Sequence, residues 1–278
     1  MKIPSTLNEL EKQFIKHDIP TSKIAFYNHD NFLRAESKNQ SFLELYGAFV
    51  RMRKRDADYD KYVRRVVPIV AQQLARETLS DGQKGACVDV ALMFTKILEE
   101  LGVWSYSIQG ALKITNPELP TPTHFWMFDE DPIPGHVWVV APPYEIIDIT
   151  LQAQPYQRQE ANLVPRILLS EGGKRITPKS TDFFEPSLLD RHHQMIGGKI
   201  ASIHEQTHPS IMSAVKFFPS WLIKEGKTQL RYATAGISLS DAPNLNALKS
   251  RTWNGRYASA ILEDLVRPAL KPSSQEGS

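Results

Sequence analysis

The apolar pattern changes from helical spacing to alternation shortly after residue 101, and this change constrains the fold more than any other feature of the sequence. Over residues 87–101, apolar side chains recur at three- and four-residue steps, which predicts one buried helix face that ends at Gly102. Residues 103–115 then alternate, which is typical of a β-strand, with a bend at Gly110.

Three more apolar runs follow, and turns rich in proline or acidic residues separate them. The runs cover residues 124–128, 136–141 and 144–151. They predict successive antiparallel strands. A helix followed by such strands indicates an α+β fold, in which the helix that begins at Cys87 packs on an antiparallel sheet.

The flanking sequence is predicted to be mostly helical. Thr6 and Glu9 have the spacing of a capping box before a first helix. Helical periodicity also occurs at about 41–55, 58–79, 210–225 and 254–270. The chain therefore divides into an N-terminal helical region over 1–79, a core over 80–152, a mostly helical region over 153–271 and a disordered tail over 272–278.

Composition excludes several classes of function. The chain has 33 basic and 31 acidic residues, which gives no overall attraction to nucleic acid or to an anionic membrane. A basic stretch over 51–65 could bind phosphates, but aspartates interrupt it, so a solvated helix face is the simpler interpretation.

No apolar run reaches the roughly 18 residues of a membrane span, and no secretion signal is evident. A single cysteine fits a reducing compartment. We therefore expect a cytoplasmic protein with no nucleic-acid or membrane partner.

Cys87 is the candidate nucleophile. It follows a glycine-containing loop and begins an amphipathic helix, and a helix N-terminus favours the thiolate that attacks a substrate. Gly85 lets a substrate carbonyl approach the backbone closely. The Cys87 backbone N–H is the first candidate to stabilise an oxyanion, and Gln83 is the nearest side-chain candidate. The alternatives are a packed core cysteine and, for Gln83, a solvated loop residue.

His136 is the candidate base and Asp148 the residue that orients it. If the chain reverses at Pro142 and Pro143, residues face each other when their numbers add up to about 284, as those of His136 and Asp148 do. His124 is the alternative base, because His124 and His136 share the pattern His-x-Trp.

Three segments together resemble the transglutaminase-like superfamily, which has a papain-like Cys-His-Asp arrangement. Residues 85–92 (GACVDVAL) resemble its nucleophile helix, 136–139 (HVWV) its histidine strand and 147–150 (IDIT) its aspartate strand. The resemblance covers about residues 80–152. It implies the triad Cys87, His136 and Asp148 and a covalent intermediate on cysteine. The superfamily includes protein crosslinkers, cysteine peptidases, peptide N-glycanases and arylamine acetyltransferases.

A second motif competes with this interpretation. Residues 204–208 (HEQTH) match H-E-x-x-H, in which two histidines on one helix face bind zinc and the glutamate activates water. Pro209 follows directly and disfavours the helix that the motif needs. No third ligand is evident, although Glu225 is conceivable and His192 and His193 are another source. We expect a polar loop here, with a zinc hydrolase that uses His204 and His208 as the alternative.

The sequence thus predicts a cysteine-dependent acyl-transfer enzyme that needs neither cofactor nor metal. A thiol protease or other amidase that acts on a protein or peptide is preferred, because no motif for a second substrate is evident. The alternatives are a transglutaminase or amine acyltransferase, and a binding module that has kept the fold without catalysis.

Overall fold

The computed structural model describes residues 3–128, 135–156, 159–196, 203–240, 242–248 and 252–271. In these residues no helix combines the length and apolar character that crossing a membrane requires. The predicted disordered tail over 272–278 lies outside them.

Four helices precede the core. They are α1 (Leu7–Lys16), α2 (Asp30–Lys38), α3 (Phe42–Met52) and α4 (Ala57–Asp81). The predicted cap is confirmed, because the Thr6 hydroxyl accepts a hydrogen bond from the Glu9 backbone N–H. Gly82 ends α4 in the left-handed conformation (φ +75°) that glycine adopts readily.

The core follows in the predicted order. It comprises α5 (Cys87–Glu100), β1 (Tyr106–Thr115), β2 (Thr123–Phe125), β3 (His136–Ala141), β4 (Tyr144–Asp148) and the 3-10 turn η2 (Leu151–Ala153). Two runs are shorter strands than expected. Of the run 124–128 only His124 and Phe125 lie in strand β2, and the run 144–151 leaves the sheet after Asp148. The α+β class predicted from the pattern is confirmed, with α5 packed against β3.

The C-terminal part departs most from expectation. It contributes strands β5 (Leu168–Ser170), β6 (Lys174–Ile176), β7 (Ser220–Glu225) and β8 (Thr228–Ser238), and helices α6 (Ser180–Phe183), α7 (Pro186–Ile196), α8 (Ile203–Thr207) and α9 (Pro209–Phe217). The prediction of one helix over 210–225 is wrong. Pro219 forces Phe218 into extended backbone, so α9 ends there and a strand begins. Gly226 (φ +58°) then turns β7 back into β8.

The last helical segment agrees better with the sequence pattern. The helix predicted over 254–270 occurs as α10 (Ala258–Ile261), a π-helical turn (Leu262–Val266) and α11 (Arg267–Leu270). Its buried side chains belong to the same hydrophobic cluster as α4 and α5.

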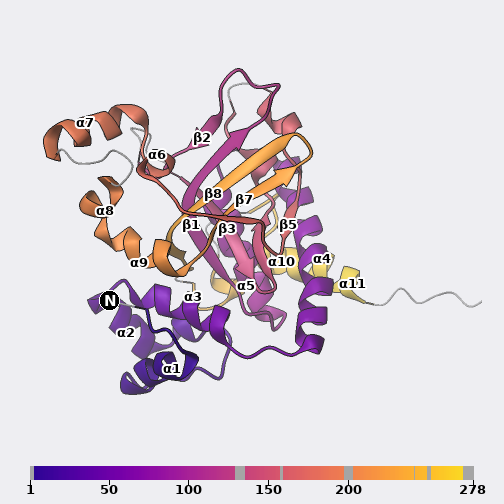
Figure 1. Ribbon diagram of the computed structural model, residues 1–278. Helices are drawn as coiled ribbons and strands as arrows, with labels where there is room; N and C mark the ends of the chain where they lie inside the picture. Colours follow the sequence, from indigo (N-terminus) through magenta and orange to yellow (C-terminus); the bar gives the residue numbers. More distant parts are fainter. Residues whose placement is uncertain are drawn as a thin grey trace, which may run out of the picture.

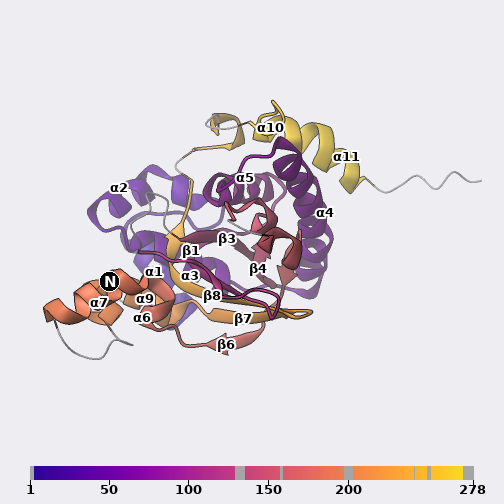
Figure 2. The same ribbon diagram turned by 90° about the horizontal axis from the view of Figure 1, so that it is seen from above.

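All strand pairs of the sheet are antiparallel, in the order β5-β4-β3-β1-β8-β7-β6, with β2 added beside β1. Thus β8 inserts next to β1, although more than a hundred residues separate them. Figure 1 places α1 and α2 together at one end of the molecule, and Figure 2 shows α4 and α5 on one side of β3 and β4.

Alternation along β3 sends its side chains into two different cores. Val137, Val139 and Ala141 join the cluster that contains α5 and Cys87. Trp138 and Val140 join the cluster that contains the aromatic side chains of α1–α3. His136 begins this strand, so its position is fixed by a sheet that is buried on both faces.

Candidate active site

Cys87 is the first residue of α5, as the sequence predicts, and only 3% of it is exposed. The loop before it is fastened to the turn after β4, because the Gly85 N–H donates to the Ala153 carbonyl at 2.9 Å. Gly85 has φ +72°, a conformation that suits glycine. A small cavity between α5 and β3–β4 is lined by Cys87 and Asp148 among others. The fold therefore brings the start of the helix to the ends of these two strands.

The structure joins His136 to Asp148. Nε2 of His136 lies 2.6 Å from Oδ2 of Asp148, and both side chains are fully buried. The direct pairing expected from the hairpin is wrong by two positions, because β3 and β4 pair Val139 with Ile147 after an irregularity next to the turn. Continuing that register makes His136 a diagonal neighbour of Asp148, which a histidine side chain can still reach.

Asp148 is held by four hydrogen bonds. Oδ1 accepts from the Thr150 backbone N–H and hydroxyl, both at 3.0 Å. Oδ2 accepts from the Tyr232 hydroxyl at 2.9 Å and pairs with His136. Burial raises the pKa of the Asp148 carboxyl, but the His136 charge and these hydrogen bonds outweigh it, so the pKa is lowered overall. A buried carboxylate with this many donors stays ionised.

The pKa of His136 is shifted in the opposite direction from that of Asp148. Burial lowers the pKa of the imidazole, but the charge and hydrogen bond of Asp148, together with a smaller contribution from Cys87, raise it to about 10. Nε2 faces Asp148, and Nδ1 makes no hydrogen bond of ordinary geometry to a described residue. Nδ1 is therefore the nitrogen left to exchange a proton with the Cys87 thiol.

Tyr232 was not predicted as a site residue. It is fully buried in β8, and its ring meets the edge of Trp138 at a centroid distance of 5.0 Å. The signal that could have found it is the alternation of residues 228–238 after Gly226, which indicates a strand. Sequence pattern alone does not show that this strand inserts beside β1.

The Phe125 ring lies beside the histidine, and the Tyr156 ring packs against Phe125. The Phe125 ring lies 6.1 Å from the His136 ring and 5.9 Å from the Tyr156 ring. Phe125 and Tyr156 are both partly exposed, whereas His136 is fully buried. A substrate that reaches His136 from this side meets these rings first.

The alternative base lies elsewhere. His124 in β2 stacks on Trp126 at 4.6 Å and lines a separate cavity of about 390 Å³ with Asp182. Burial, and to a lesser extent Lys113, lowers the pKa of His124 to about 4. The candidate oxyanion residue Gln83 is exposed and has no hydrogen bond to a described residue. Of the two candidate bases, the structure thus brings His136, and not His124, to Asp148.

The HEQTH segment does not form a zinc-binding helix face, and the polar loop expected there is wrong, because Ile203–Thr207 forms the short helix α8. His204 lies in the short helix α8, where Nδ1 pairs with the Ser180 hydroxyl at 2.8 Å, and His208 precedes α9 and stacks on Phe128 at 4.0 Å. Among the described residues no group of three or more potential ligands is placed to hold a metal ion. The zinc alternative therefore gains no support from the geometry.

Comparison of this chain with protein-family models, curated proteins and solved structures finds no match. The likeness of residues 85–92, 136–139 and 147–150 to a transglutaminase-like core therefore stays a prediction. What the site can do follows from its own geometry. A cysteine at a helix N-terminus and a buried histidine fixed by an ionised carboxylate are the elements of nucleophilic acyl transfer.

Proposed function

We propose that the protein is a cysteine-dependent acyl-transfer enzyme with a transglutaminase-like core. One observation carries the proposal. His136 is paired with Asp148 at 2.6 Å through Nε2, while its other nitrogen has no hydrogen-bond partner among the described residues and the pKa of the ring is raised in part by Cys87.

The proposed reaction has two halves. In the resting site the proton of Cys87 lies on Nδ1 of His136, in keeping with the raised pKa of that ring, and the sulfur attacks an amide or ester carbonyl to form a tetrahedral oxyanion. The imidazolium then protonates the leaving amine or alcohol, which departs and leaves a thioester on Cys87. In the second half, the neutral His136 removes a proton from water, the hydroxide attacks the thioester, and the carboxylic acid leaves, so that the free Cys87 sulfur again lies beside a protonated His136.

Asp148 keeps its charge throughout this cycle. Its four hydrogen bonds hold the carboxylate in one orientation, and its charge stabilises the imidazolium form of His136. The backbone N–H groups at the start of α5 are the nearest donors for the oxyanion.

Water as the second substrate makes the protein a peptidase or amidase, and this is the form we propose, with a protein or peptide as substrate. An amine as the second substrate would make it a transglutaminase or acyltransferase through the same thioester. A non-catalytic binding module would keep the fold without the reactivity of Cys87.

Alkylation of Cys87 tests the proposal directly. Because the chain has one cysteine, intact mass spectrometry reads the labelling by iodoacetamide without ambiguity. We expect the folded protein to react near neutral pH, and His136→Ala to react at least about tenfold more slowly. His17→Ala, at an exposed histidine of the N-terminal region, is the control. Equal alkylation rates in the wild type and in His136→Ala, with both proteins folded, would contradict a catalytic triad of Cys87, His136 and Asp148.

A further inference from the structure

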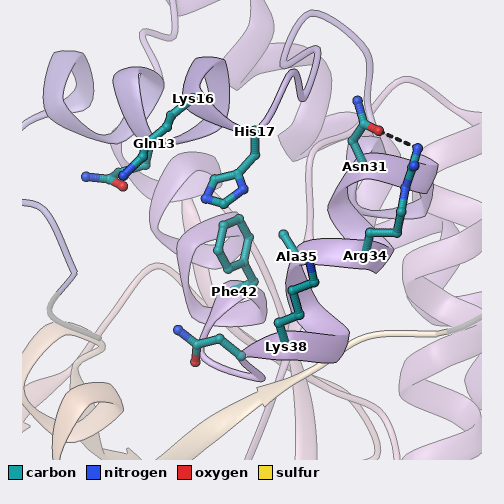
Figure 3. Close-up of a pocket in the computed structure, with 9 residues that line it drawn as sticks. Gln13, Lys16, His17, Asn31, Arg34, Ala35, Lys38 and Phe42 are labelled. Atoms are coloured by element: carbon teal, nitrogen blue, oxygen red, sulfur yellow. Dashed lines mark hydrogen bonds between the residues drawn. The ribbon is translucent and has the colours of Figure 1, made fainter.

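The helical N-terminal region contains a cavity of about 410 Å³ that the proposed reaction does not use. It lies among the end of α1, helix α2 and the start of α3, as Figure 3 shows. A cavity of this size can hold a small ligand. The chemistry of its lining decides which ligand.

The lining is strongly basic. Lys16, Arg34 and Lys38 contribute positive charges, and His17 lies among them. The described lining residues include no aspartate or glutamate. Within the part of the chain that the structure describes, no carboxylate forms an ion pair with any of the three cations. Since the whole chain balances 33 basic against 31 acidic residues, this excess of charge is local.

Arg34 is oriented by its neighbours and keeps donors to spare. Nη2 donates to Oδ1 of Asn31 at 2.7 Å, and Nε donates to the Asp30 carbonyl at 3.3 Å. Asn31 is itself held by the Asp18 carbonyl at 2.7 Å. A guanidinium carries five N–H donors, so several remain for a ligand. The planar fork that they form matches the oxygens of a phosphate.

His17 is fixed from below by an aromatic ring. Its imidazole meets the Phe42 ring at a centroid distance of 5.0 Å and an angle of 88°. Figure 3 shows the His17 ring amid the other labelled side chains, directly above Phe42. Phe42 is 4% exposed, so the ring that orients His17 is itself anchored in the core.

Helix dipoles explain only part of this arrangement. Lys16 and Lys38 lie in the last turns of α1 and α2, where a cation stabilises the helix. That effect accounts for a positive charge at each helix end. It does not require both side chains to line the same cavity together with Arg34.

We propose that this cavity binds a small molecule that carries a diphosphate group. Arg34 supplies the planar fork, and Lys16 and Lys38 neutralise the remaining negative charge. Three cations match the charge of a diphosphate, and they surpass what a single carboxylate needs. The inference does not depend on the proposed reaction at Cys87.

Isothermal titration calorimetry with inorganic pyrophosphate tests the site in the full-length protein at low salt. We expect binding that weakens as ionic strength rises, because the cations are exposed. Arg34→Gln and Lys38→Gln should each weaken binding about tenfold. The matched control is Lys61→Gln, which removes an exposed lysine of α4 outside the cavity and should change binding less than about twofold.

Three results would overturn the proposal. These are no measurable heat with the folded wild-type protein, equal weakening in Lys61→Gln and Lys38→Gln, or tighter binding of citrate than of pyrophosphate. Circular dichroism checks that each variant is folded, and since Arg34 and Lys38 occupy separate exposed positions, either variant alone suffices if the other fails.

Discussion

Two histidines in this protein share the local sequence His-x-Trp and have opposite properties. His136 begins strand β3 and is fully buried, whereas His124 lies within strand β2 and is partly buried. The pKa of His136 is raised to about 10, whereas that of His124 is lowered to about 4. The difference lies in what each ring meets, because His136 has the Asp148 carboxylate at 2.6 Å and His124 has Lys113 and a stacked Trp126.

This comparison shows that a local motif does not decide the role of a histidine. Burial by itself favours the neutral ring, and an ionised neighbour reverses the preference. Substitutions that change the surroundings of either histidine therefore test whether the neighbouring charge sets its properties.

The largest effect is expected from Asp148→Asn, which makes the surroundings of His136 resemble those of His124. Removing one charge of a buried pair leaves the other uncompensated, so we expect the free energy of unfolding to fall by about 3 kcal/mol. Alkylation of Cys87 should also slow at least about tenfold. Chemical denaturation and intact mass spectrometry measure the two effects.

The control for that variant is Asp182→Asn. Asp182 pairs with Arg231 at 2.6 Å, but Arg231 keeps 23% of its side chain exposed, so water compensates part of the loss. A loss of stability in Asp148→Asn no greater than in Asp182→Asn would contradict the view of His136 and Asp148 as a desolvated ion pair.

A smaller effect is expected from Tyr232→Phe, which removes one donor from the Asp148 carboxylate. A hydrogen bond to a charged group contributes about 1.5 kcal/mol or more, and we expect a loss of that size in denaturation. The lowered pKa of Asp148 stabilises the fold above the ordinary value of 3.8, and this contribution is lost as pH falls through the folded-state pKa. With one donor fewer, that pKa is less lowered, so acid unfolding should begin at a higher pH.

Tyr62→Phe is the matched control, because its hydroxyl donates to the neutral Leu101 carbonyl at 2.6 Å. It should lower stability by about 1 kcal/mol and leave the pH of acid unfolding in place. If both variants shift acid unfolding equally, Tyr232 has no special role at the carboxylate.

His124 should make the free energy of unfolding depend on pH. Its folded-state pKa is lower than the ordinary 6.5, so the neutral ring stabilises the fold above pH 6.5, and this contribution is lost as pH falls toward about 4. His124→Gln should therefore be relatively more stable at pH 5 than at pH 8, by about 1 kcal/mol after allowance for the partial exposure of the ring. Thermal unfolding at the two pH values measures it, and a difference of the opposite sign would contradict the assigned environment.

The smallest effect is expected from His124→Ala on the reactivity of Cys87. Because His124 lines a separate cavity and has no contact with Asp148 in the described structure, alkylation should stay within about twofold of the wild-type rate. If His124→Ala slowed the alkylation of Cys87 as much as His136→Ala does, His124 and not His136 would be the base.

The sequence predicted where the core helix and strands begin and end better than it predicted how the strands are ordered and paired in the sheet. Cys87, His136 and Asp148 could be singled out because a helix start, a strand start and a strand end each leave a local signal. The register of β3 with β4 could not, since the irregularity beside the turn depends on packing from both faces. Strand β8 and its Tyr232 were missed because insertion beside β1 is a long-range event, and because helical spacing was extended through Pro219.

A titration of the His136 ring by nuclear magnetic resonance tests the central claim most directly. The account predicts that the ring stays protonated through pH 8 and loses its proton near pH 10, and that Cys87→Ala shifts this midpoint to lower pH, because the contribution of the thiol is gone. A ring that titrates at or below the ordinary 6.5, or a midpoint that Cys87→Ala leaves unchanged, would contradict a histidine shared between Asp148 and Cys87.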